Sequence, residues 1–120
     1  MTIEKRIEEL QTLYGKDNIT SKIVEGTTLV RIKSVELPQG CKPEKTDFLL
    51  AIPQQQDTPS KRYVKENVKL PNGNTPRNLN PTMVDGESWY DFSYAFQWNP
   101  TTDPMYQYVE SALHRFAKTD

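Results

Sequence analysis

Cysteine, histidine and glycine are scarce in this chain of 120 residues, which has one cysteine, one histidine and five glycines. A single cysteine, Cys41, excludes an internal disulfide and a cysteine-rich zinc site. The only histidine, His114, has no other ligands at the spacings that a tetrahedral zinc site requires. Phosphate-binding glycine loops are also missing. The composition therefore predicts a protein with no metal site and no cofactor.

Charge of one sign and long apolar runs are missing as well. Fifteen basic and sixteen acidic residues leave a formal charge of -1, which is unlike the basic field of a general nucleic-acid binder. No apolar run is long enough to cross a membrane, and the first residues are amphipathic rather than a signal peptide. We therefore expect a cytoplasmic protein with no nucleic-acid and no membrane partner, folded as a single domain over residues 1–120.

Helices are predicted at both ends of the chain. Near the N-terminus, Ile3, Ile7 and Leu10 recur at three- and four-residue steps, and Gly15 is a plausible helix stop. Near the C-terminus, Pro104 suits the start of a helix because its missing N–H would have no partner there. This second helix has an apolar stripe made of Met105, Tyr108, Val109, Ala112, Leu113 and Phe116.

Strands are predicted between the two helices. Alternating or β-branched apolar residues mark four segments, at 21–24, 27–37, 46–52 and 62–70. Residues 75–83 are dominated by Pro, Asn and Thr, so we expect an irregular segment that crosses the sheet. The predicted fold is α+β: an N-terminal helix, a four-stranded antiparallel meander, an irregular crossing segment and a C-terminal helix.

Aromatic residues are concentrated between Trp89 and Trp98, a stretch that holds both tryptophans, two tyrosines and two phenylalanines. Such a density is unusual for a surface loop, because large aromatics gain the most from burial. We interpret the stretch as a knob that is folded over the sheet and pinned by the following helix. Trp89, Phe92 and Trp98 are then candidates for an interface, although core packing is the simpler role for the two tryptophans.

No catalytic constellation emerges from the remaining residues. Cys41 is the only possible thiol nucleophile, and a reactive thiol needs a base or a positive field beside it. Lys42 and Lys45 supply some positive charge, but an ordinary loop cysteine is the simpler interpretation. The acidic residues Asp85, Glu87 and Asp91 are close in sequence and resemble a carboxylate pair for acid–base work, but turn and cap chemistry is the simpler account.

Several short motifs occur in an order and spacing that match one known family. They are Val35–Gly40, Lys45–Pro53, Tyr63-Val64, Leu70–Gly73, Gly86–Trp89, Phe92-Ser93, Trp98–Pro100 and Asp103. Together they resemble the prokaryotic branch of the ubiquitin-conjugating-enzyme-like (UBC-fold) superfamily whose members often lack the catalytic cysteine. The resemblance extends over almost the whole chain, from about Leu13 to Phe116.

This resemblance implies a non-catalytic protein of a bacterial ubiquitin-like conjugation system, with a role in antiphage defence. Its expected partners are a ubiquitin-like protein or the activating enzyme, bound through the aromatic stretch or through Ile3 and Ile7 on the N-terminal helix. The chain departs from the family at residues 54–59, which lack the usual Tyr-Pro pair, and it has no cysteine after the fourth strand.

Two alternatives stay open. In the first, the chain is an active carrier enzyme that uses Cys41 as the acceptor. In the second, it is an adaptor unrelated to conjugation.

Overall fold

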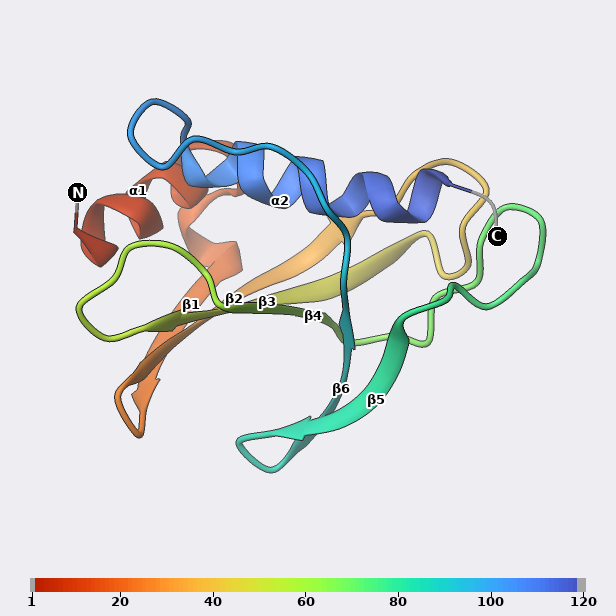
Figure 1. Cartoon of the computed structure of the whole chain (residues 1–120), viewed down its shortest axis with the longest axis horizontal. Helices are drawn as coiled ribbons and strands as arrows, with labels where there is room; N and C mark the ends of the chain where they lie inside the picture. Colours follow the sequence, from red (N-terminus) through yellow and green to blue (C-terminus); the bar gives the residue numbers. More distant parts are fainter. Residues whose placement is uncertain (1, 119–120) are drawn as a thin grey trace.

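Two α-helices lie on one face of a curved sheet in the computed structural model, which describes residues 2–118 (Figure 1). Helix α1 spans Ile3–Tyr14 and begins at Thr2, whose hydroxyl accepts a hydrogen bond from the Lys5 N–H. Helix α2 spans Met105–Leu113 and continues as a 3₁₀ turn, η2, over His114–Ala117. Helices at both ends and the α+β class are confirmed.

No helix among the described residues combines the length and the apolar character that crossing a membrane requires.

The sheet is antiparallel throughout, with six strands in the order β1-β2-β3-β4-β6-β5 within residues 2–118. The first four follow one another along the chain, and a 3₁₀ turn, η1 (Lys16–Asn18), connects α1 to the first of them. Their bounds are β1 Ile19–Val24, β2 Thr27–Glu36, β3 Lys45–Pro53, β4 Lys61–Val64, β5 Leu79–Val84 and β6 Glu87–Phe92.

The sequence predicts four strands, and the two additional ones form a hairpin where a loop and an aromatic knob are expected. Asp85 and Gly86 join β5 to β6 with φ angles of 49° and 80°, the positive values that a tight two-residue hairpin turn needs. Pro81 is tolerated inside β5 because β5 is the outermost strand, where a missing backbone donor leaves no neighbour unpaired. The crossing segment is therefore only partly irregular.

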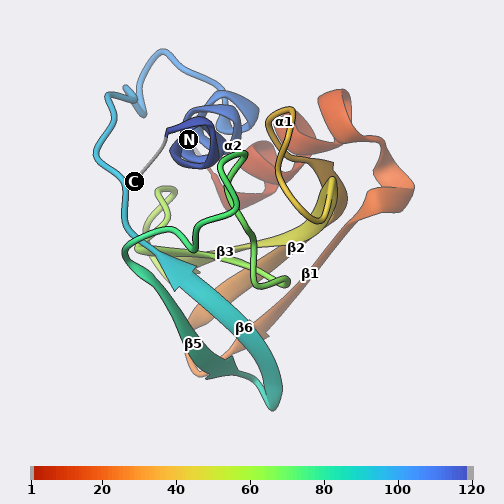
Figure 2. The ribbon, with the colours of Figure 1, turned by 90° about the vertical axis from the view of Figure 1, so that its right-hand side faces the viewer.

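The two faces of the sheet carry separate apolar clusters. The large core lies between the sheet and the helices, and it includes Phe48, Leu50, Phe92 and the whole apolar stripe of α2. On the other face lies a smaller cluster of five buried residues, Leu29, Leu49, Ala51, Tyr63 and Trp89. Within the part of the chain that the structure describes, no helix covers this second face; instead the β5–β6 hairpin bends away from the helices (Figures 1 and 2). The sheet therefore has a concave face that is built from strands alone.

Arg6 connects α1 to the segment that precedes α2. Its side chain is fully buried, and its guanidinium lies 4.9 Å from the centre of the Trp98 ring. Its nitrogens donate to the carboxylates of Glu9 and Asp57 and to two backbone carbonyls, those of Pro100 and Asp103. These four acceptors offset much of the cost of burying the charge, although the Arg6 Nε is buried without a hydrogen-bond partner. The sequence pattern gives no sign of this role.

Candidate functional site

The concave face of the sheet carries a cluster of cation–π contacts and ion pairs around Trp89. Because side chains alternate along a strand, Trp89 points to this face while Phe92 points to the helices. Trp89 is only 2% exposed, although it lies on the helix-free side. The curl of β6 and two cationic side chains on the ring account for its burial.

Arg31 and Lys65 cover the Trp89 ring. The Arg31 guanidinium carbon is 5.0 Å from the ring centre and the Lys65 Nζ is 5.1 Å from it, both within the range of a cation–π contact. Glu87 holds both cations: its carboxylate accepts from Arg31 at 3.1 and 3.2 Å and from Lys65 at 3.1 Å. Asp47 accepts from Arg31 Nε at 2.9 Å.

Electrostatics in this cluster favour the charged state of Glu87. The hydrogen bond from Lys65 and the positive charges of Lys65 and Arg31 lower the pKa of the Glu87 carboxyl below its ordinary value. Asp47 is fixed separately, because its second oxygen accepts the backbone N–H of Ser34 at 3.0 Å, inside an irregularity of β2. The charges on this face are therefore paired and held at defined positions.

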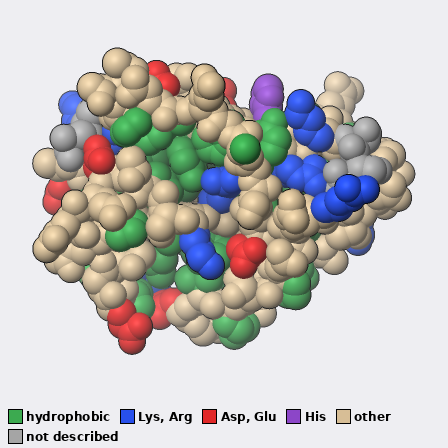
Figure 3. All heavy atoms as spheres, viewed as in Figure 1, with side chains coloured by type: hydrophobic (Ala, Val, Ile, Leu, Met, Phe, Trp, Pro, Cys, Tyr) green, Lys and Arg blue, Asp and Glu red, His purple; other side chains and the backbone are tan. Residues whose placement is uncertain are grey.

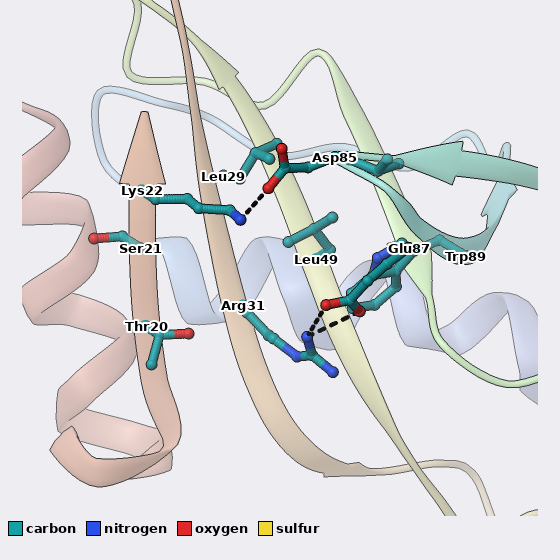
Figure 4. Close-up of a pocket in the computed structure, with 10 residues that line it drawn as sticks. Thr20, Ser21, Lys22, Leu29, Arg31, Leu49, Asp85, Glu87 and Trp89 are labelled. Atoms are coloured by element: carbon teal, nitrogen blue, oxygen red, sulfur yellow. Dashed lines mark hydrogen bonds and ion pairs between the residues drawn. The ribbon is translucent and has the colours of Figure 1, made fainter. Parts of the chain in front are cut away.

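A small cavity of about 200 Å³ lies beside this cluster, between β1, β2 and the hairpin (Figure 4). Leu29, Leu49 and Trp89 contribute its apolar lining. An ion pair between Lys22 on the outer strand β1 and Asp85 in the hairpin turn spans its mouth (Figure 4). One charged pair thus joins the first strand of the open sheet to the hairpin turn.

A second, larger hollow of about 820 Å³ lies on the helix side, between α1, the outer strand β1 and residues 54–57. It brings together Ile3 and Ile7, the two residues that the sequence suggests for an interface, with Ile23 of β1. Ile23 is 72% exposed, the most exposed of the large hydrophobic residues in the described chain. The first two isoleucines are half-buried against the core, so the groove has an apolar floor and an exposed apolar rim.

The aromatic stretch does not form one knob. Trp89 lies on the concave face, and Phe92 is buried in the helix-side core against Phe48 and Phe116. Trp98 is only partly buried; it stacks edge-on against Tyr108 and donates its indole N–H to the Pro104 carbonyl at 3.0 Å. Hydrophobic side chains are visible around this region, between the segment before α2 and the sheet (Figure 3). The three candidate aromatics therefore belong to three different environments.

Cys41 lies in the helix-side core, at the loop between β2 and β3. Its thiol is 2% exposed and 3.2 Å from the backbone carbonyl of Phe116, to which it donates. Burial raises the pKa of the Cys41 thiol, which disfavours the reactive thiolate. Neither a base nor a cavity among the described residues adjoins the sulfur in a way that activates it. Its surroundings are those of a structural cysteine.

The other chemistry candidates also have structural surroundings. His114 is exposed at the end of α2, and no three His, Cys, Asp or Glu side chains within residues 2–118 gather as metal ligands. Asp85 and Glu87 are not paired with each other, since each is bound to a cation. Asp85 and Glu87 therefore do not form a carboxylate pair for acid–base work, and the described side chains include no positioned nucleophile.

The sequence predictions do not include the buried Arg6 or the concave face. The sequence does carry a signal for the concave face. Asp85-Gly86 is typical of a two-residue hairpin turn, and Glu87, Trp89 and Asp91 follow it at steps of two, which places them on one face of a strand. For Arg6 no local signal exists, because its acceptors lie up to 97 residues away in the chain.

Comparison of the chain with protein-family models, with curated proteins and with solved structures gives no match in any of the three. Its function must therefore be argued from the residues and their placement.

Proposed function

We propose that this protein is a UBC-like binding protein of a bacterial ubiquitin-like conjugation system, one that holds a partner without accepting it covalently. The partner is a ubiquitin-like protein or its activating enzyme, in the cytoplasm and in the setting of antiphage defence. Supporting this are the motifs from Val35 to Asp103 that resemble the family, together with an antiparallel sheet between two terminal helices. The β5–β6 hairpin adds two strands to the four that the resemblance implies.

The observation that carries the proposal is the burial of the only thiol. A carrier enzyme needs a cysteine that reaches solvent and ionises, since the thiolate is the nucleophile that accepts the cargo. Cys41 is instead enclosed by the core, bonded to the Phe116 carbonyl and protonated by preference. The alternative of an active carrier that uses Cys41 is disfavoured by this placement.

The groove beside α1 is the surface that best suits a protein partner. Exposed apolar side chains beside a cleft are typical of interaction sites, because water covers them at a free-energy cost. Strand β1 is also an outer strand, so its free backbone edge lies along the same groove. We therefore assign partner binding to Ile3, Ile7 and Ile23.

A binding experiment with matched variants tests this assignment. The double variant Ile3→Arg/Ile23→Arg places charges in the groove, and Leu13→Arg/Met83→Arg makes the same changes at two exposed hydrophobic residues elsewhere. Each is measured by biolayer interferometry against a ubiquitin-like protein and an activating enzyme, the two partner classes that the resemblance implies. We expect the groove variant to lose at least about tenfold in affinity, the loss that removing one interface hot spot produces.

Two results would count against the account. If the wild-type protein binds neither partner, the conjugation role is wrong. If both double variants lose affinity equally, binding exists but does not use the groove.

A further inference from the structure

We propose that the cavity on the concave face binds a small carboxylate with an apolar tail, a role separate from partner binding. The apolar lining of the site lies on the helix-free face of the sheet, whereas Ile3 and Ile7 lie on the helix side. Ser21 and Lys22 of the outer strand β1 line both the site and the groove. It is formed by β1, β2, β3 and the β5–β6 hairpin, which the chain brings together only through the curl of the sheet (Figure 4).

The lining divides into an apolar part and a charged part. Leu29, Leu49, Val84 and Trp89 provide the apolar part, in which a hydrocarbon chain loses its contact with water. At the charged part, Lys22 and Arg31 approach the cavity from neighbouring strands and point toward the hairpin (Figure 4). A ligand that satisfies both parts has an apolar body and an anionic end.

The Lys22 ammonium has N–H donors to offer a ligand at the cavity, which favours an anionic ligand over a cationic one. Lys22 has three donor hydrogens and makes one ion pair, with Asp85, while 62% of its side chain remains exposed. Arg31 forms an ion pair with Asp47, which does not line the cavity. Its second ion pair, with Glu87, is more exposed to solvent than the pair with Asp47. A ligand carboxylate replaces Asp85 on Lys22 without leaving a buried charge unpaired, because Asp85 turns to solvent in the hairpin turn.

For a cation, the two carboxylates that line the cavity are already paired, Asp85 with Lys22 and Glu87 with Arg31 and Lys65. The face of Trp89, which would attract it, is already covered by Arg31 and Lys65. The volume limits the ligand further: about 200 Å³ is smaller than the roughly 300–1,000 Å³ of drug-sized sites, so a short aliphatic or single-ring acid fits best.

Nuclear magnetic resonance of the intact protein tests the proposal with octanoate, octylammonium and octanol as probes. The two tryptophan indole N–H signals report on the two surfaces, Trp89 on the cavity and Trp98 on the helix side, and Trp98→Phe identifies which is which. We expect octanoate to shift the Trp89 signal saturably and to leave that of Trp98 in place. Octylammonium should have no saturable effect, and octanol a weaker one than octanoate.

Two substitutions at the mouth should act in opposite directions. Lys22→Gln removes the cation, so octanoate binding should weaken by about two- to fivefold, the usual contribution of an exposed ion pair. Asp85→Asn removes the competing carboxylate and keeps a side chain suited to the positive φ of the turn, so binding should tighten by a similar factor. Equal responses to octanoate and octylammonium, or the same direction of change in both variants, would overturn carboxylate recognition. No shift of the Trp89 signal at millimolar octanoate would overturn the site itself.

Discussion

Replacing Arg6 by Met should destabilise the fold strongly, although Arg6 is a charged residue of helix α1. The guanidinium is fully buried and donates to two carboxylates and two backbone carbonyls that come from three different segments. Methionine fills much of the same volume but donates nothing, so these acceptors lose their partner.

The loss of unfolding free energy in Arg6→Met depends on how well the acceptors become hydrated once Arg6 is gone. Breaking a buried ion pair by removing one partner costs about 3–5 kcal/mol. The carboxylates of Glu9 and Asp57 keep 19% and 26% of their side-chain surface exposed, so they rehydrate in part. The lower end, about 3 kcal/mol, therefore applies; for a chain of this length it corresponds to a fall in Tm of about 12 °C.

Urea denaturation followed by circular dichroism measures this loss directly. Lys5→Met, one position away, is the matched control, because its ion pair with Glu8 is largely exposed on both sides. We expect the control to change the free energy of unfolding by less than about 0.5 kcal/mol. An Arg6→Met variant that loses less than about 1 kcal/mol would refute the view that this residue ties α1 to the C-terminal segments.

Three other predictions concern Gly40, Glu87 and Cys41. Gly40→Ala should lower the free energy of unfolding by at least about 1 kcal/mol more than Gly73→Ala. Both glycines have a positive φ, but only a Cβ added at position 40 meets another atom, the Pro71 Cβ at 2.9 Å. Equal losses in urea melts would contradict this prediction. The pKa of Glu87 is lowered in the fold by Lys65 and Arg31, so its stabilising effect is present above its ordinary pKa of 4.5 and disappears as pH falls through the lowered value. Wild type and Glu87→Gln should therefore differ in stability at pH 7 and converge in acid, and a gap that widens on acidification would show the wrong sign. Cys41 should react with a thiol reagent far more slowly in native protein than in urea, since it is buried and its pKa is raised; similar rates in the two conditions would mean that the thiol is accessible.

Local patterns account for the parts of the fold that the sequence predicts well. The three- and four-residue steps from Ile3 to Leu10 and the stripe of α2 each specify a helix with one buried face, and both helices form. The hairpin was missed because Pro81 and the neighbouring Asn and Thr residues read as loop, and only its place at the outer edge of the sheet makes a strand possible there.

The candidate sites were harder to predict, because they depend on contacts between distant residues. Trp89 and Phe92 are three residues apart in sequence but lie on opposite faces of β6, so proximity along the chain misplaced them in one knob. Ile3 and Ile7 are gathered with Ile23 only when β1 lies beside α1. Arg6 and Arg31 take their roles from partners that no local pattern identifies.

We propose that the protein binds a ubiquitin-like protein or its activating enzyme and does not carry cargo on the Cys41 sulfur. The most direct test mixes the protein with the ubiquitin-like protein, the activating enzyme and ATP, and compares gels run with and without reductant beside native size-exclusion profiles. We expect a complex in the native profile and no reductant-sensitive band on the gel, with the Cys41→Ser variant behaving as wild type. An adduct that reductant removes and Cys41→Ser abolishes would contradict the claim, as would the absence of any complex.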